Sequence, residues 1–407
     1  MAAPLAHLRV LDLSRVLAGP WASQFLADMG AEVIKIEKPG EGDDTRGWGP
    51  PFVREPSKGD PGMSAYFLCA NRGKKSVTVD MAAAEGQELI RKLAAKSDVM
   101  IENFKVGGLA KYGLDYASIK AINPGIVYCS ITGFGQTGPY ASRAGYDFLV
   151  QGMGGLMSVT GEPDGVPGGG PVKVGVAISD QVAGLNALAG ILAALVRRER
   201  TGEGDHIDVA LLDSTVSSLI NQASTHLVAG TVPGRMGNAH PTVVPYQAFP
   251  TAKGYIILAI GNDGQFARFC KAASLHEMGA DPRYTTNTQR IVNRATLIPQ
   301  IAAALATRTA DEWIAIFEPL AVPCGPINTI DQVFQDRQVR ARNTRRTLDH
   351  DEVGPLPVVA NPVRMASHDT TAPKAPPLLG EDTEEVLREL LGLSATELAG
   401  LRSKKVV

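Results

Sequence analysis

The sequence predicts an α/β protein with a mostly parallel sheet in a large domain and a smaller α+β second domain. Three observations favour this class. Short apolar runs alternate with helical periods along the N-terminal part of the chain, and the pattern changes character after residue 224. The length of 407 residues also allows about two to three domains. Strands that alternate with helices pair in parallel and are covered by helices on both faces.

The predicted large domain consists of repeated βαβ units. Its strands are short apolar runs, its helices place apolar residues on one side, and Pro20 fits the first turn of the first helix. In chain order we predict strand 8–13, helix 20–29, strand 31–36, strand 76–80, a helix around 89–93, strand 98–101, a helix around 116–122, strand 125–132, a Gly/Pro-rich loop at 161–175, helix 180–198, strand 206–210 and a helix to about 226. This order is typical of a Rossmann-like sheet.

The remaining chain is predicted to form a second domain and a returning tail. A strand at 254–260 precedes helices from about 287 to 319. Strand-like alternation at 347–360 and a polar helical segment after 380 follow, and we expect this tail to pack on the first domain. The predicted boundaries are 1–224 for the large domain, 225–327 for the small domain and 328–407 for the C-terminal segment.

Composition excludes several classes of function. The chain has 40 Lys and Arg against 42 Asp and Glu, a net charge of −2, so no overall field attracts nucleic acid or an anionic membrane. Its 4 Cys are far apart, without the spacing of a zinc site, and we expect no metal. We see no leader and no apolar run of membrane-spanning length, so a cytoplasmic protein is expected.

One glycine motif resembles half of a dinucleotide-binding fingerprint. Gly133-Phe-Gly-Gln-Thr-Gly138 matches G-x-G-x-x-G after a predicted strand, but Pro139 follows and no acidic residue ends a strand about 20 positions on. A glycine-rich turn near the ligand-binding edge of the sheet is the favoured interpretation. The chain has no phosphate-loop motif, since Gly73-Lys74 lacks a glycine at position 68, and no G-x-S-x-G.

Two other segments are candidates for ligand contact. Asn71-Arg-Gly-Lys-Lys-Ser76 gathers three cations at a glycine turn and, with Lys38, could surround phosphates; taken alone, the stretch favours a solvated basic turn. Gly261-Asn-Asp-Gly264 follows a predicted strand, and its two glycines favour a mobile loop; a plain strand-to-helix turn is the alternative.

Asp180 is the candidate for covalent chemistry. It is predicted to open the long helix after the Gly/Pro-rich loop, where an acidic residue commonly caps the helix. An ionised Asp can also attack an activated acyl group. A helix N-terminus would favour the ionised form and supply donors to a developing oxyanion.

An ordered set of motifs carries a resemblance over nearly the whole chain. The motifs are Val10-Leu-Asp-Leu with Ala18-Gly-Pro, Gly30-Ala-Glu-Val-Ile-Lys-Ile-Glu, Asn71-Arg-Gly-Lys-Lys-Ser, Ile131-Thr-Gly-Phe-Gly with Gly138-Pro, Gly145-Tyr-Asp and Pro377-Leu-Leu-Gly. Together they resemble the family III CoA-transferases, which include formyl-CoA:oxalate, carnitine and succinyl-CoA:glutarate transferases and the related 2-methylacyl-CoA racemases. The resemblance implies an interlocked homodimer of ring-like chains, with coenzyme A or acyl-CoA as substrate and no tightly bound cofactor.

The resemblance also implies roles for individual residues. Asp180 matches the nucleophile, Tyr146 and Asp147 match a pair beside it, and Gly261 and Gly264 match a loop that closes over the aspartyl intermediate. The implied reaction passes through an aspartyl anhydride and an aspartyl-CoA thioester. Positions that match CoA-binding residues are Arg15, Val16, Ala18, Lys38, Arg72, Lys75, Asn103, Phe104 and Lys111.

Departures from the family patterns narrow the implied reaction. Racemases carry a His where this chain has Tyr146, and oxalate-specific members carry a Gln where Leu17 stands, so both activities are alternatives to the leading one. The runs 43–52 and 244–249 are most similar to the succinyl-CoA:glutarate branch. The leading hypothesis is transfer of CoA from succinyl-CoA to a dicarboxylic acid, with Arg46 or Arg235 as the partner of the second carboxylate. A non-catalytic CoA-binding protein is the alternative from another class.

Overall fold

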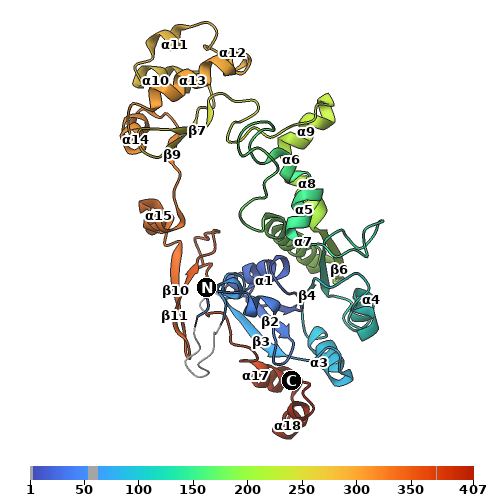
Figure 1. Cartoon of the computed structure of the whole chain (residues 1–407). Helices are drawn as coiled ribbons and strands as arrows, with labels where there is room; N and C mark the ends of the chain where they lie inside the picture. Colours follow the sequence, from blue (N-terminus) through green and yellow to red (C-terminus); the bar gives the residue numbers. More distant parts are fainter. Residues whose placement is uncertain (1–2, 54–62, 373) are drawn as a thin grey trace. The chain divides into compact units, whose positions relative to one another are not determined.

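The computed structural model describes residues 3–53, 63–372 and 374–407 (Figure 1). They fall into two compact units. Unit 1 comprises Met1–Leu156, Val174–Ser224 and Arg337–Val407, and unit 2 comprises Met157–Lys173 and Thr225–Asp336. The domain boundaries proposed from the sequence stay a prediction, because compactness does not show that a segment folds by itself.

Unit 1 contains the parallel sheet that the sequence predicts. Its six strands have the order β3-β2-β1-β4-β5-β6, and every neighbouring pair is parallel. The strands are β1 Arg9–Asp12, β2 Glu32–Glu37, β3 Lys74–Thr78, β4 Val99–Glu102, β5 Val127–Thr132 and β6 Asp205–Ala210. The order reverses between β1 and β4, which places a topological switch point at the carboxyl ends of these two strands.

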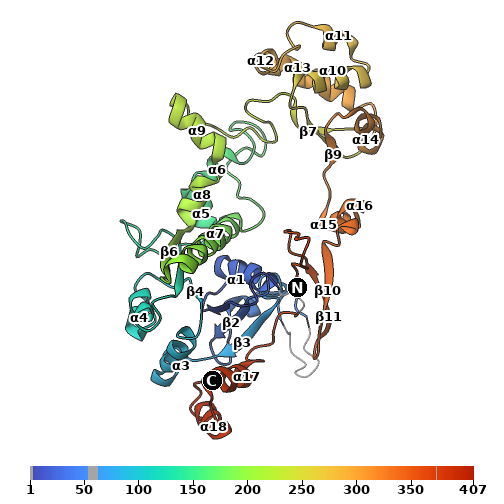
Figure 2. The ribbon, with the colours of Figure 1, turned by 180° about the vertical axis from the view of Figure 1, so that it is seen from behind.

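Both faces of the sheet are covered because successive side chains of a strand point to opposite faces. On one face Val10 packs with buried residues of α1 (Ala18–Asp28) and α7 (Ile178–Thr201). On the other face Leu11 packs with α3 (Ala84–Ala94), α4 (Tyr116–Ile122) and the C-terminal helices α17 (Thr383–Leu391) and α18 (Ala395–Ser403). Figure 2 shows the chain from behind, with α17 close to β3. There the Ser76 N–H donates to Asp382 Oδ2 at 2.8 Å.

Two predicted helices differ from the structure, and the strand-like alternation predicted at 347–360 is confirmed. Helix α7 begins at Ile178, so Asp180 lies in its first turn and does not open it. The helix predicted to continue to about 226 is broken into α8 (Leu211–Ser217) and α9 (Ile220–Ala229), and Ile220, the first residue of α9, has a φ of 46°. The alternating tail forms an antiparallel pair, β10 (Arg345–His350) and β11 (Gly354–Val359).

Helix α7 also differs from the expectation that no segment is apolar enough to cross a membrane. Judged by length and composition alone, this helix passes that test. Its Ala183, Ala187 and Ile191 are fully buried in the core of unit 1. These contacts explain its apolar composition, because a helix that lies across a sheet needs small and branched apolar residues on its inner side.

Unit 2 combines a small antiparallel sheet with helices. Its strands, in the order β7-β8-β9, are Tyr246–Pro250, Tyr255–Ala259 and Cys324–Pro326. Its helices include α10 Asp263–Ala272, α11 His276–Ala280, α12 Asn287–Val292, α13 Arg294–Leu305, α14 Ala310–Phe317 and α15 Ile330–Gln335. Phe249, Phe269 and Trp313 belong to one buried cluster of this unit, so strands and helices share a core.

Candidate active site

A cavity of about 530 Å³ in unit 1 lies at the switch point of the sheet. Its walls are the loop 15–18 after β1, the loop 103–106 after β4, the end of β5, residues 141–147 before α5 (Asp147–Met153) and Asp180 of α7. Parallel strands bring these loops together because their carboxyl ends meet at one edge of the sheet. Asp44, Trp48 and Leu211 complete the lining. The residues come from parts of the sequence that are far apart, so only the fold assembles the cavity.

Asp147 organises the start of helix α7 beside Asp180. Its Oδ1 accepts the Ser179 N–H at 2.7 Å and the Asp180 N–H at 3.4 Å, and its Oδ2 accepts from Gln151 Nε2 at 2.7 Å. The fully buried Gln151 in turn accepts the Val174 N–H at 2.9 Å. Asp147 therefore caps α7, whose own N-cap residue, Ala177, has no side-chain acceptor.

This capping corrects the predicted electrostatics of Asp180. The sequence suggested that the helix N-terminus would keep this carboxyl ionised, but the first donors of α7 are occupied by Asp147. Burial, followed by the negative charge of Asp147, raises the pKa of Asp180 from 3.8 to about 7. A desolvated carboxyl beside a second carboxylate resists ionisation, and once ionised it is a stronger nucleophile than a solvated Asp.

The raised pKa predicts the pH dependence of activity. Below about pH 7 the Asp180 carboxyl is neutral and cannot attack, so kcat/KM for an acyl-CoA donor should rise with pH to a plateau above that value. Asp147→Asn removes the second cause of the shift and should move the midpoint to lower pH. The measurement is kcat/KM between pH 5 and 9 for wild type and variant with one donor.

A matched control separates this effect from a general change of charge. Glu199→Gln removes the same charge near the far end of α7, about 28 Å from Asp180 at 1.5 Å per residue. Its midpoint should equal that of the wild type. A wild-type midpoint below pH 5, or the same midpoint in Asp147→Asn as in the wild type, would contradict the origin assigned to the pKa shift.

Tyr66 is a site residue that the sequence analysis missed. Burial and then the charge of Asp180 raise the pKa of its phenol to about 12, so it stays a neutral hydrogen-bonding group. Its ring meets that of Trp48, a cavity-lining residue, edge to face at 5.3 Å between centroids. No pattern marks Tyr66, because its neighbourhood with Asp180 exists only in the tertiary structure.

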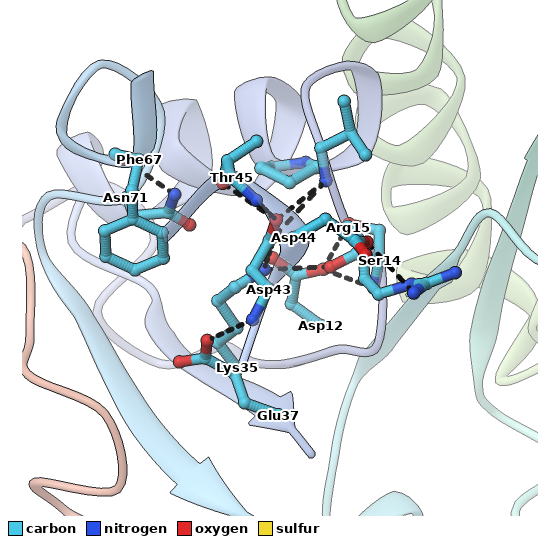
Figure 3. A network of polar contacts seen from close by, with 12 residues as sticks. Asp12, Ser14, Arg15, Lys35, Glu37, Asp43, Asp44, Thr45, Phe67 and Asn71 are labelled. Atoms are coloured by element: carbon cyan, nitrogen blue, oxygen red, sulfur yellow. Dashed lines mark hydrogen bonds and ion pairs between the residues drawn. The ribbon is translucent and has the colours of Figure 1, made fainter. Parts of the chain in front are cut away.

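The loop after β1 is fixed by buried charges (Figure 3). The Val16 N–H donates to both carboxylate oxygens of Asp43 at 3.2 Å, and Lys35 Nζ lies 2.8 Å from Asp43 Oδ2. Burial disfavours the charged form of Asp43, but Lys35 and the hydrogen bonds from Thr45 together more than offset this and lower the pKa of Asp43 to about 2. Val16 has a φ of 70°, which a β-branched residue adopts only when its surroundings hold it there.

The same loop is joined to the one after β4. The Arg15 N–H donates to Asn103 Oδ1 at 2.9 Å, and Asn103 Nδ2 donates back to the Arg15 carbonyl at 2.7 Å. Phe104 lies next to this pair, with the Arg15 guanidinium 5.4 Å from its ring centroid. Two loops that are far apart in the sequence are therefore held as one wall of the cavity.

A second cavity of about 410 Å³ adjoins the first. The two cavities share Arg15, Asp44, Phe104 and Lys105, and the second is also lined by Lys38 and Lys111. Among the predicted site residues, Arg15, Val16, Ala18, Asn103, Phe104, Tyr146 and Asp180 line the first cavity. An elongated ligand with a reactive end near Asp180 and phosphates near Lys38 and Lys111 fits this arrangement.

The structure places four of the predicted cations in ion pairs away from these functions. Arg72 is 5% exposed and bonds Asp28 and the Val359 carbonyl, while Lys75 pairs with Glu32 and Glu385, and neither residue lines the two cavities. Arg46 pairs with Glu37 at 2.7 Å and stacks on Phe67. Arg235 pairs with Asp164 in unit 2. A sequence shows where the basic residues are, but not which of them form ion pairs with acidic side chains of the same chain.

The predicted glycine loop belongs to unit 2. The Gly261 N–H donates to Gln265 Oε1 at 2.7 Å, and Asn262 accepts the Gln265 N–H as the N-cap of α10. Gly264 lies in the first turn of α10. The roles of Gly261 and Gly264 stay a prediction.

Fold and cavities define the class of protein: an α/β protein with two adjoining cavities at the switch point of a parallel sheet, one of them lined by the candidate nucleophile Asp180. The chain belongs to CoA-transferase family III, whose family model matches residues 5–383. It is therefore a transferase of CoA, as the sequence motifs predicted.

Individual relatives and a solved structure agree with this membership. The chain is 48% identical to a succinate–glutarate CoA-transferase of Agrobacterium fabrum over 97% of each chain. It is 44% identical to the succinyl-CoA:glutarate CoA-transferase of Mus musculus, over 95% of this chain and 86% of the relative. A crystal structure of a CAIB/BAIF family protein from Brucella suis superposes with a TM-score of 0.84 at 48% identity, over 96% of this chain and 100% of that one.

Proposed function

We propose that this protein transfers CoA from succinyl-CoA to a dicarboxylic acid, with glutarate as the first candidate acceptor, through covalent intermediates on Asp180. The observation that carries the proposal is the carboxyl of Asp180 in a cavity that continues toward Lys38 and Lys111. Two similar relatives named for succinate or succinyl-CoA and glutarate support the choice of substrates.

The chemistry divides into two matching halves. A carboxylate oxygen of Asp180 attacks the donor thioester, the C–S bond breaks, and CoA leaves as a thiolate with a mixed anhydride on the enzyme. The thiolate then attacks the Asp180 carbonyl, which releases succinate and leaves an aspartyl-CoA thioester. The acceptor carboxylate attacks this thioester and repeats the two steps in reverse, so the reaction balances without any further reagent.

Residues around Asp180 have positioning roles in this proposal. Asp147 holds the first turn of α7 and thereby the backbone of Asp180. Cations of the second cavity hold the phosphates of CoA, and binding energy from that distant end can orient the thioester at Asp180. Asp43 and Lys35 keep the loop at Val16 in place against the ligand.

The racemase alternative lacks support at the site. Moving an α-proton needs two bases, and Tyr146, which is 68% exposed at the start of α5, stands where the second base would be required. No observation in the cavity favours oxalate as acceptor.

We also propose that the chain works as a homodimer in the cytoplasm. In unit 1 the apolar Leu185, Leu192 and Val196 are exposed at spacings that place them on one side of α7, and Val216 of α8 is exposed as well. Exposed apolar side chains that share one side of a helix are a surface that a protein partner can cover.

The test of the proposed reaction is a panel of acids. Purified protein, succinyl-CoA and each acid are incubated, and the CoA products are identified by mass spectrometry. We expect glutaryl-CoA with glutarate and no incorporation of deuterium at the α-carbon of an acyl-CoA in the absence of an acid. Deuterium uptake without an acceptor would establish isomerisation instead, and tight CoA binding without transfer would show a binding protein.

A further inference from the structure

The basic side chains that line the first cavity with Asp180 differ in their ion-pair partners. These side chains are Arg15, Lys105 and Arg143. Arg15 pairs with Asp44 at 3.0 Å, and Lys105 also lines the second cavity. Arg143 lines the first cavity and not the second, and no acidic side chain in the described residues lies within the 4.0 Å of an ion pair with it.

Arg143 is oriented by two aromatic rings. Its guanidinium carbon lies 4.6 Å from the ring centroid of Tyr140 and 5.2 Å from that of Phe134. The rings pack edge to face at 5.6 Å, and Phe134 is buried directly after β5. A guanidinium packed on an aromatic ring keeps N–H donors at its edge available for another partner. Arg143 Nη2 donates to Met153 Sδ at 3.9 Å, and a thioether sulfur is a weak acceptor.

We propose that Arg143 binds the unreactive carboxylate of the dicarboxylic substrates, so that it selects dicarboxylates over monocarboxylates at the Asp180 cavity. This inference rests on the proposed function and names the residue that recognises its substrate class. A planar guanidinium pairs a carboxylate through two parallel N–H···O bonds, which suits one flat ligand group. Arg46 and Arg235, the residues predicted for this role, already have carboxylate partners.

The charges of the cavity explain why a cation is needed there. Asp147 and Asp180 both line it, and a dicarboxylate brings two further negative charges. When the acceptor enters, Asp180 is a thioester without charge, but Asp147 remains beside it. Arg143 offsets this repulsion and gives the second carboxylate a charged partner that a monocarboxylate cannot use.

The experiment compares two acids of the same chain length. With succinyl-CoA as donor, kcat/KM is measured for glutarate and for valerate; in a ping-pong reaction each value reports its own half-reaction. Arg143→Gln should lower kcat/KM for glutarate by about 10- to 100-fold, the range of a lost charge-assisted hydrogen bond. It should change the value for valerate by less than about threefold, and Arg143→Lys should recover part of the glutarate activity. Where valerate turns over too slowly, its inhibition constant against glutarate gives the same comparison.

Controls separate selectivity from other roles of Arg143. Arg200→Gln removes the same charge near the far end of α7, about 30 Å from Asp180, and should leave the ratio of the two acids unchanged. Equal losses for glutarate and valerate, no loss for either, or a rise in KM for all acyl-CoA donors alike would overturn the role of Arg143. If the wild type transfers CoA to neither acid, the proposed function itself fails, and with it the inference that depends on it.

Discussion

Asp180→Asn should lower kcat/KM for CoA transfer by about 10⁴-fold, because it removes the nucleophile while keeping its size. Hydroxylamine added during turnover should convert Asp180 of the wild type to a hydroxamate, which peptide mass spectrometry detects. The variant should show no such product. Full activity in the variant, or a hydroxamate at another carboxylate, would end the proposal of an Asp180 intermediate.

Stability measurements distinguish this loss from misfolding. A carboxyl whose pKa is higher in the folded state binds protons better when folded, so its ionised form destabilises the protein above about pH 7. The free energy that the neutral carboxyl contributes to folding is fully present below pH 3.8, the ordinary pKa of Asp. It is lost as the pH rises through about 7, the pKa in the folded state. The Asn variant should therefore unfold at the same or a slightly higher temperature than the wild type at pH 8. Asp213→Asn, which removes an exposed acid of α8, should change neither activity nor stability.

Lys35→Met should destabilise unit 1 by about 3–5 kcal/mol, the usual cost of removing one partner of a buried ion pair. The side chains of Lys35 and Asp43 are both 0% exposed, and Lys35 also donates to the Ser14 carbonyl at 2.8 Å. Its loss leaves a buried carboxylate without a cation beneath the loop of Val16. The free energy of unfolding from urea titration at pH 7.5 measures the effect.

Lys38→Met is the matched control for this change. Lys38 lies three residues further along the chain, with its side chain 60% exposed in a surface pair with Glu41. Such pairs contribute about 0–1 kcal/mol, so the control should retain nearly all the stability. The double variant Lys35→Met with Asp43→Asn should recover part of the loss. A Lys35→Met protein within 1 kcal/mol of the wild type would show that water or another group already compensates Asp43.

Periodicity predicted most of the sheet, because its central strands are buried on both faces. Val10 and Leu11 illustrate the reason: both are apolar although they point to opposite faces, and this continuous run is typical of a parallel sheet. The strand ends shifted by a few residues only. The break at Ile220 was not predictable in the same way, because a positive φ at an Ile is imposed by its surroundings and not by its own preference.

Residues of the candidate site were predictable where a sequence motif marks them. The ion-pair partners of basic residues were not, because these partners come from distant parts of the chain. Asp180, Tyr146 and Asn103 were found from ordered motifs, and all three line one cavity. Arg72 was assigned to CoA binding from the family resemblance, and the structure places it buried against Asp28, 44 positions away in the sequence. The ion-pair partner of a long cationic side chain depends on which loops lie together in the fold, and the local sequence does not indicate this.

Asp180 illustrates which properties of the site follow from the sequence and which follow from the tertiary structure. The sequence by itself determined the α/β class, the order of its strands and helices, the membership of a CoA-transferase family and the carboxyl that stands at the start of α7. Only the tertiary structure decided that Asp147 takes the first donors of that helix, that the pKa of Asp180 is raised to about 7, and that Arg143 lines the same cavity as Asp180. Burial and the distance between charges set ionisation and pairing, and both exist only once the chain has folded.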